Sequence, residues 1–235
     1  MGYQCRFILC DIEGTTSSVS YVYNVLFPYF RNHLNEITQF AHLIEVKEAF
    51  NQVISICQKE EGIVLTTSED VLQKLLQWSL SDRKLTPLKT LQGLIWDKGY
   101  RLGELKGHVY EDVLPNFEKW KLNHLNIGIY SSGSVTAQKL IFKYSNAGDL
   151  TKFLLHYFDT NIGMKKDFNS YCLIAKKLLL NPEEILFLSD IQEELDAANL
   201  AGFKTIHILR EDGMTSNSIY RAKNFDEVNS LLYQI

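Results

Sequence analysis

The segment FILCDIEGTTSSV, residues 7–19, is the feature that most constrains how this chain can fold. It opens with an apolar run of the kind that forms a strand covered on both faces of a sheet. Asp11 and Glu13 follow this run at once, and Gly14 can bend the chain so that both acids reach one pocket. Because ligands bind beyond the carboxyl ends of the strands in open parallel sheets, the two acids fall where a site is expected.

Short apolar runs recur along the chain, and amphipathic helical stretches separate them. The expected strands cover residues 6–10, 126–130, 156–158, 185–188 and 205–209. The expected crossover helices, with apolar residues at intervals of three and four, cover residues 134–144, 168–179 and 193–201. This alternation predicts an α/β fold with a doubly wound, Rossmann-like parallel sheet.

The segment between the first two expected strands is far too long to be a simple crossover. It shows helical spacing at residues 43–56, 68–79 and 86–101, and no strand signal of comparable strength. We therefore expect a helical cap subdomain over residues 21–103, inserted into a core domain made of residues 1–20 and 104–235.

Charge and apolar content exclude several classes of protein. The chain has 235 residues and a formal net charge of -4, which disfavours a broad basic surface for nucleic acid. No apolar run approaches the roughly 20 residues of a membrane helix. The first residues also lack the apolar centre of a signal peptide. We therefore expect a cytoplasmic protein that binds neither nucleic acid nor a membrane.

The cysteines suggest neither a disulfide framework nor a structural metal site. Cys5, Cys10, Cys57 and Cys172 form no CxxC pair and have no histidine at zinc spacing. We expect them to be buried free thiols in a reducing compartment.

Polar side chains follow the later strands as they follow the first. The second strand leads into Ser131 and Ser132, Lys165 follows the third, and Asp190 and then Glu194 follow the fourth. Because parallel strands end at one edge of a sheet, acids, hydroxyls and a lysine are expected to converge there.

This set of residue types suits phosphoryl transfer. A carboxylate such as Asp11 can attack phosphorus, but two anions repel, so a divalent cation and several donors must neutralise the phosphate. Asp11 and Asp190 can hold Mg²⁺ through oxygen ligands. Glu13 can protonate the leaving oxygen and later deprotonate the attacking water. The groups suited to the phosphate oxygens are Ser131, the Ser132 amide and Lys165.

Each motif also has a purely structural interpretation. Residues 11–15 can be a helix N-terminus whose acids complement the helix dipole, and residues 131–134 can be an ordinary strand–helix turn. Lys165 alone is more often a solvated charge, and Asp190 with Glu194 can enrich a first helical turn in acids. The order of the motifs along the chain is what favours the phosphoryl-transfer site.

That order resembles the haloacid dehalogenase superfamily. Its members carry a nucleophilic Asp after the first strand, a Ser or Thr after the second, then a Lys and a final acidic motif. The matching residues are Asp11, Ser131, Lys165 and Asp190 with Glu194. The resemblance implies a core of the same Rossmann-like fold.

The first motif is more specific, because Glu13 stands where the superfamily usually has a second Asp. DIEGTT followed by Phe27-Pro28 is similar to the enolase-phosphatase (acireductone synthase) family of methionine salvage. Further stretches agree with it, namely SDRK at 81–84, LQGLIW at 91–96, YSSGSV at 130–135, AQKL at 137–140, FDT at 158–160, IGMK at 162–165 and FLSD at 187–190.

The resemblance implies a bifunctional enzyme with one Mg²⁺ per chain. It would enolise 2,3-diketo-5-methylthiopentyl-1-phosphate, a small-molecule phosphate ester, and then remove phosphate to give 1,2-dihydroxy-3-keto-5-methylthiopentene. Asp11 would be nucleophile and metal ligand, Glu13 a ligand through its backbone carbonyl and a candidate acid and base, and Asp190 a metal ligand. The substrate-binding residues would be Ser131, Ser132 and Lys165. Family members are typically monomers.

Three alternatives stay open beside this interpretation. Another capped phosphatase of the superfamily is disfavoured by Glu13 and by the cap stretches. A receiver-type signalling domain would have its phosphoacceptor after the third strand, at Asp159, and no long insertion. A noncatalytic interaction module would have lost at least one pocket residue, and none is lost.

The cap offers four candidates for closing over a substrate. They are Arg83, Lys84, Trp96 and Tyr100. Trp96 and Tyr100 lie four residues apart on an expected helix, which is more often the spacing of core residues.

Overall fold

The computed structural model describes residues 5–211, 213–232 and 234. It divides into two compact units: one ends at Val19 and resumes at Lys106, and the other spans Ser20–Leu105. The boundaries expected from the sequence, after residues 20 and 103, stay a prediction about domains. Among the described helices, none combines the length and apolar content needed to cross a membrane.

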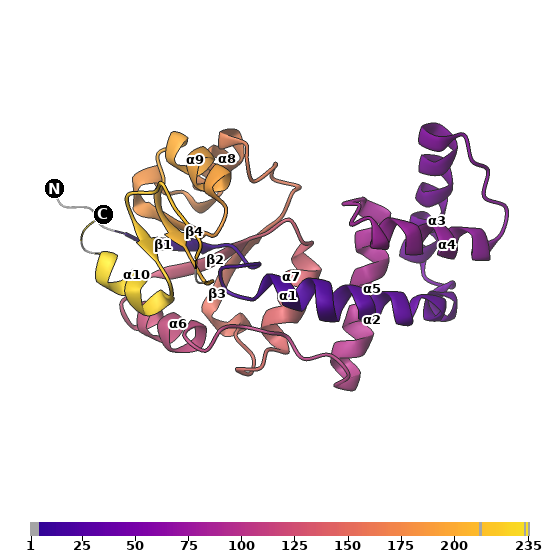
Figure 1. Cartoon of the computed structure of the whole chain (residues 1–235), viewed down its shortest axis with the longest axis horizontal. Helices are drawn as coiled ribbons and strands as arrows, with labels where there is room; N and C mark the ends of the chain where they lie inside the picture. Colours follow the sequence, from indigo (N-terminus) through magenta and orange to yellow (C-terminus); the bar gives the residue numbers. More distant parts are fainter. Residues whose placement is uncertain (1–4, 212, 233, 235) are drawn as a thin grey trace. The chain divides into compact units, whose positions relative to one another are not determined.

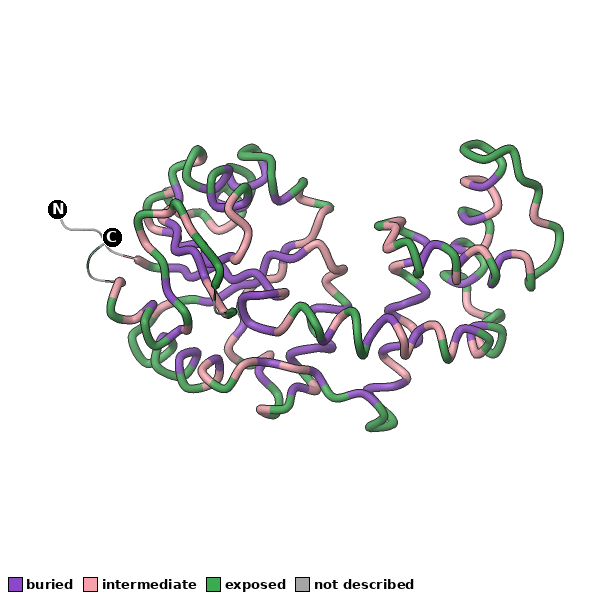
Figure 2. Tube along the Cα trace, viewed as in Figure 1, coloured by how far each residue is buried: buried purple, intermediate pink, exposed green. Residues whose placement is uncertain are grey.

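The first unit is built on a parallel sheet, in the order β3-β2-β1-β4-β5-β6 (Figure 1). Its strands are β1 (Phe7–Cys10), β2 (Asn126–Tyr130), β3 (Leu154–Phe158), β4 (Ile185–Ser189), β5 (Lys204–Ile208) and β6 (Arg221–Ala222). β1 and β4 are buried along their whole length, as Figure 2 shows, which explains why they read as unbroken apolar runs. The predicted Rossmann-like parallel fold is confirmed.

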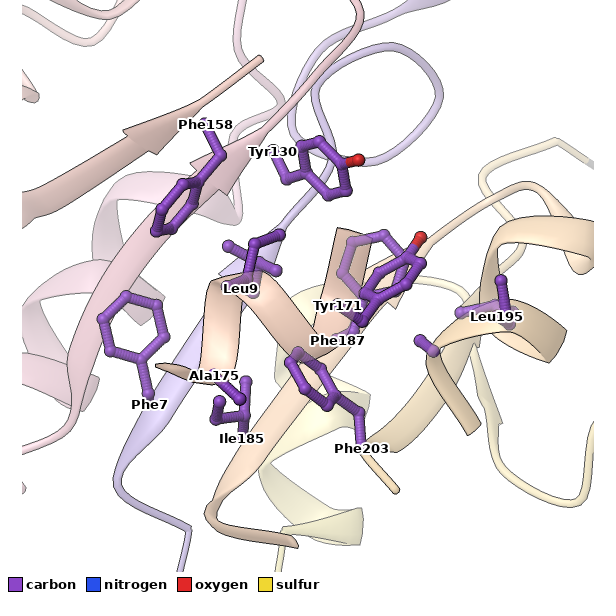
Figure 3. Close-up of a cluster of buried hydrophobic side chains, with 13 residues drawn as sticks. Phe7, Leu9, Tyr130, Phe158, Tyr171, Ala175, Ile185, Phe187, Leu195 and Phe203 are labelled. Carbon is purple, nitrogen blue, oxygen red and sulfur yellow. The ribbon is translucent and has the colours of Figure 1, made fainter. Parts of the chain in front are cut away.

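Helices cover both faces of this sheet. α8 (Phe168–Leu178) and α9 (Gln192–Leu200) lie over one face, where aromatic rings of the sheet and of α8 form the cluster drawn in Figure 3. Tyr171 is central to this cluster, since its ring packs edge-on against Tyr130, Phe187 and Phe203.

On the other side, Figure 1 draws α6 (Val113–Leu122) and α10 (Phe225–Leu231). Phe117 contacts the rings of Trp120, Phe225 and Phe142, the last from α7 (Val135–Lys143). The Trp120 indole N–H donates to Asn229 Oδ1 at 2.7 Å, so the one polar atom of this ring is satisfied. Two short 3₁₀ turns, Thr151–Phe153 and Pro182–Glu184, lead into β3 and β4.

The second unit is helical. Its elements are α1 (Val19–Tyr21), η1 (Val22–Leu26), α2 (Phe27–Asn32), η2 (Leu34–Phe40), α3 (Ile44–Ile56), η3 (Cys57–Glu61), α4 (Ser68–Leu80) and α5 (Thr86–Leu102). Thr67 and Asp70 form a capping box that starts α4, and Gly103 in the left-handed conformation ends α5. The three cap helices expected from spacing therefore begin and end within about a residue of α3, α4 and α5.

Some elements and one cysteine prediction differ from what the sequence suggested. Among the described residues, the two-residue strand β6 pairs with β5 alone, and it is too short to leave a periodic signal. The helices α6 and α10 were not expected. The prediction of buried thiols is wrong for Cys172, which is exposed on α8, and for Cys5, which is partly exposed, whereas Cys10 and Cys57 are buried and free.

Candidate active site

The register of the sheet brings the functional strand ends together. Cys10, the last residue of β1, lies opposite Ile129 on one side and Leu188 on the other. The next backbone N–H, that of Asp11, still donates to Leu188 O at 2.9 Å. Asp11 thus lies just beyond the last paired residue of β1, flanked by the residues that follow β2 and β4.

A buried cluster of opposite charges forms the centre of the site. Lys165 Nζ lies 2.6 Å from Asp11 Oδ1 and 2.6 Å from Glu194 Oε2, and all three residues are buried. Ser189 Oγ donates a further hydrogen bond to Glu194 Oε2. Burial acts to lower the pKa of Lys165, but the two carboxylates more than offset it, so the pKa lies above its ordinary value. Lys165 is therefore a permanent cation beside Asp11.

Three hydroxyls fix the backbone that carries Lys165. Tyr130 OH donates to the Gly163 carbonyl at 2.9 Å, Ser170 Oγ to the Met164 carbonyl at 2.8 Å, and Tyr171 OH to the Lys165 carbonyl at 2.6 Å. The loop between β3 and α8 therefore has three consecutive carbonyls held by side chains from β2 and α8. Sequence reasoning missed these hydroxyls, because the tyrosines look like ordinary core residues.

The turn after β1 is tight and strongly hydrogen bonded. The Ile12 carbonyl accepts from the N–H groups of Thr15, Thr16 and Ser17, at 3.2, 3.0 and 2.8 Å. Gly14 has φ of +74°, a conformation that other residues rarely adopt. The prediction that Gly14 bends the chain is confirmed, and the bend leaves the Glu13 carboxylate within reach of Ser131, whose Oγ lies 3.3 Å from Glu13 Oε2.

The loop after β2, residues 131–134, is the serine loop, and it is also held by hydrogen bonds. Ser131 is fully buried, its N–H donates to the Phe158 carbonyl, and its Oγ accepts from Gly133 N at 3.1 Å. Ser132 is half-buried. Ser134 caps α7 by accepting from Ala137 N, so the loop also serves as the strand–helix turn of the structural interpretation.

Asp190 has an unpartnered oxygen in this crowded site. Its Oδ1 is buried without a hydrogen-bond partner among the described residues. Burial raises the pKa of Asp190 to about 6. Its backbone carbonyl is fixed by His207 Nε2 at 2.9 Å, while His207 Nδ1 lies 2.7 Å from Ser216 Oγ. The bond to the carbonyl places a proton on Nε2, and Nδ1 pairs with the serine hydroxyl.

The site carries more negative than positive charge. Asp11, Glu13, Asp190 and Glu194 interact electrostatically with one another, and Lys165 is the only cation in contact with them among the described residues. Burial and the neighbouring carboxylates also raise the pKa of Asp11, against the opposing effect of Lys165. A further cation would relieve this imbalance.

The available donors fit a hard divalent cation bound by oxygen. Within the described chain no group of three or more His, Cys, Asp or Glu side chains is arranged for a metal ion. The candidate set is instead two carboxylates, Asp11 and Asp190, with the Glu13 backbone carbonyl. In the described turn, backbone N–H groups donate to the Ile12 and Ser17 carbonyls and none to that of Glu13. Oxygen donors of this kind suit Mg²⁺.

The four candidates in the cap have partners within their own unit. Trp96 donates its indole N–H to the Leu26 carbonyl and Tyr100 OH lies 2.7 Å from Tyr21 OH, so the core interpretation of both rings is confirmed. The other two candidates form charged pairs, since Arg83 lies 2.7 Å from Glu60, and Lys84 lies 2.6 Å from Asp82.

Comparison with known proteins shows which proteins this chain resembles in sequence. The family model for haloacid dehalogenase-like hydrolases matches residues 5–202. The chain is 45% identical over 226 residues to enolase-phosphatase E1 of Picosynechococcus sp., which covers 96% of this chain and 99% of that protein. It is 48% identical over 206 residues to enolase-phosphatase E1 of Pseudomonas aeruginosa, covering 88% of this chain and 90% of that protein.

A solved structure is similar as well. The UTR4 protein of Saccharomyces cerevisiae matches with a TM-score of 0.77 and 32% sequence identity, over 95% of this chain and 99% of that chain. A haloacid dehalogenase-type phosphatase from Thermococcus onnurineus, at 16% identity and a TM-score of 0.61, shares the fold.

We predict that Gly14→Ala destabilises the chain far more than Gly62→Ala. Both glycines have a positive φ, +74° and +68°, so both substitutions introduce left-handed strain. Only at Gly14 would the new Cβ meet a neighbour, 2.2 Å from Asp190 Oδ2. Urea unfolding should show an additional loss of about 1–3 kcal/mol at Gly14. Equal losses for the two variants would contradict the close approach.

We predict that Asp190→Asn stabilises the metal-free chain at neutral pH. The folded-state pKa of about 6 lies above the ordinary value of 3.8, so the native state binds more protons and stability falls as pH rises through this window. The amide removes that loss, which is worth up to about 3 kcal/mol. Urea unfolding in chelator should show a gain at pH 7.5 and little gain at pH 4. A variant less stable than wild type at pH 7.5 would refute it.

Proposed function

The chain belongs to the enolase-phosphatase E1 family of haloacid dehalogenase-like hydrolases, and we propose that it converts 2,3-diketo-5-methylthiopentyl-1-phosphate into 1,2-dihydroxy-3-keto-5-methylthiopentene and phosphate. The observation that carries the proposal is the buried Asp11 carboxylate, held 2.6 Å from Lys165 at the carboxyl end of β1 with Glu13 two residues on. This is the arrangement that phosphoryl transfer to a carboxylate needs.

In the phosphatase half, Asp11 is the proposed nucleophile. Within the described chain, the Ile12 N–H and Lys165 Nζ both contact Oδ1, at 2.7 and 2.6 Å, which leaves Oδ2 to attack phosphorus. A bond forms between Oδ2 and phosphorus as the bond from phosphorus to the ester oxygen breaks. Glu13 gives the leaving oxygen a proton, and then takes one from the water that cleaves the aspartyl phosphate.

The groups around Asp11 have the complementary role of holding the phosphate. Ser131, the Ser132 amide and Lys165 are the proposed contacts to its oxygens. Since Lys165 is already shared between two carboxylates, an incoming phosphate oxygen would join an existing charge network. The same preorganised donors would stabilise the charge that develops in the transition state.

In the enolase half, a proton leaves the carbon next to a carbonyl group for a base, and the carbonyl oxygen gains a proton from the protonated base, which gives the enol. Glu13 is the proposed base, because its carboxylate is only half-buried and contacts the neutral Ser131 hydroxyl, whereas Asp11 and Glu194 are paired with Lys165. A carboxylate that no described ammonium group holds can turn toward the substrate carbon to take its proton.

We also propose one Mg²⁺ per chain, held by Asp11, Asp190 and the Glu13 carbonyl. The excess of buried carboxylates and the unpartnered Asp190 Oδ1 support it. When bound, the ion would neutralise phosphate charge and help to polarise the reacting oxygens. The proposal extends to a monomer in the cytoplasm, and gel filtration of the purified protein tests the monomer.

The direct test is to supply the diketo-methylthiopentyl phosphate with Mg²⁺ and follow two signals. Ultraviolet absorbance reports the enol and a colorimetric assay reports free phosphate. We expect both signals to appear and to vanish in chelator. Phosphate release from generic esters with none from this substrate would indicate another capped phosphatase of the superfamily.

We predict that Asp11→Asn folds normally and releases phosphate at least about 1,000-fold more slowly. The amide keeps the size of the carboxylate but has lost the attacking charge. Phosphate release is measured beside circular dichroism, with Cys172→Ser as an exposed control that should match wild type. A rate within tenfold of wild type would exclude Asp11 as the nucleophile.

A further inference from the structure

We propose that Arg210 is a positioning residue that locks the turn carrying Asp11 and Glu13 in its reactive geometry. It follows β5, far from the turn in sequence. The proposal deepens the proposed function and rests on the roles given there to Asp11 and Glu13. None of the motifs recognised in the sequence includes Arg210.

The guanidinium group binds the turn and an anchor at the same time. Its Nε and Nη2 donate to the Thr15 carbonyl at 2.9 and 2.7 Å. Its Nη1 lies 2.8 and 2.9 Å from the two carboxylate oxygens of Asp112. The Arg210 side chain is only 6% exposed, so these contacts are shielded from water.

The anchor is itself fixed from several directions. Asp112 Oδ2 accepts from Phe225 N at 2.7 Å, at the start of α10. The Arg210 guanidinium lies over the Tyr110 ring at 4.2 Å and near the Phe225 ring at 4.9 Å. Tyr110 N also donates to the Thr16 carbonyl at 3.1 Å. The turn is therefore attached a second time to the segment that contains Asp112.

The contacts of Arg210 act on Asp11 and Glu13 through the backbone of the turn. Thr15 is buried and lies two residues beyond Glu13. Without Arg210 its carbonyl would lose both described donors, and an unpaired buried carbonyl favours rearrangement of the turn. A shift of about 1 Å in a reacting group can lower a rate by about 100-fold.

Lysine cannot replace this arginine. The planar fork reaches one carbonyl and two carboxylate oxygens while it stacks on a ring, whereas an ammonium is a compact point charge. Arg210→Lys thus keeps the charge and removes the geometry. Asp112→Asn is the milder variant, since it keeps one acceptor oxygen.

The experiment compares wild type, Arg210→Lys and Asp112→Asn, with Val228→Ala as a control. Val228 is fully buried on α10, so its truncation weakens the fold at a residue outside the turn. Two readouts are needed: kcat and KM with p-nitrophenyl phosphate and Mg²⁺, and amide hydrogen exchange of residues 14–17 in the full chain without substrate.

For Arg210→Lys we expect kcat to fall about 10- to 100-fold with KM changed less than about threefold. Exchange at residues 14–17 should become at least about tenfold faster. Asp112→Asn should show a smaller fall in kcat and a smaller increase in exchange at residues 14–17. If Arg210→Lys does not fold, Asp112→Asn alone tests the proposal. Val228→Ala should change neither kcat nor exchange in the turn.

The proposal is overturned if exchange in the turn is unchanged in both variants, if kcat is unchanged despite faster exchange, or if Val228→Ala lowers kcat as much. Neither readout uses the diketo substrate. A failure of the proposed substrate assignment would leave both intact, so the two failures are distinguishable.

Discussion

The structure of the site depends on an excess of buried negative charge. Several carboxylates gather at the carboxyl end of a parallel sheet, and among the described residues one ammonium, that of Lys165, lies between two of them. Such a cluster is unfavourable in a folded chain unless its geometry is imposed from outside. The surrounding hydrogen bonds impose it, because they fix the backbone of the lysine loop, the serine loop and the turn after β1.

The imposed geometry comes from different parts of the chain for each loop. The lysine loop is held by hydroxyls from β2 and α8, the Asp190 loop by His207 on β5, and the turn after β1 by Arg210. The carboxyl ends of β1, β2 and β4 carry residues of the candidate site, and two of the side chains that hold these loops lie on or just after the neighbouring strand β5. The like charges at the centre of the site lower the stability of the fold, and the hydrogen bonds around the site offset this loss.

The sequence was sufficient to predict the strands β1 to β5 and the polar residues that follow four of them. Buried strands such as β1 and β4 leave unbroken apolar runs, and Asp11 and Asp190 follow them directly, so topology alone predicts that they meet. Arg210 and Tyr171 leave no such signal. Arg210 reaches a carbonyl 195 positions away in the sequence, and the hydroxyl of Tyr171 acts on a backbone atom that any residue would provide. The short strand β6 was missed because two residues leave no periodic signal, and α10 has only seven residues. In α6, Val113, Phe117 and Trp120 lie at helical spacing, so the sequence did carry a signal there.

The hydroxyls on the lysine loop have a consequence for the position of Lys165. They hold the backbone of residues 163–165 through neutral groups, whereas the ammonium group is held separately, by charge-assisted contacts to the Asp11 and Glu194 carboxylates. The position of the Lys165 Cα therefore does not depend on which anion its ammonium group contacts. The loop would keep its conformation if the proposed phosphate joined the two carboxylates as a partner of Lys165.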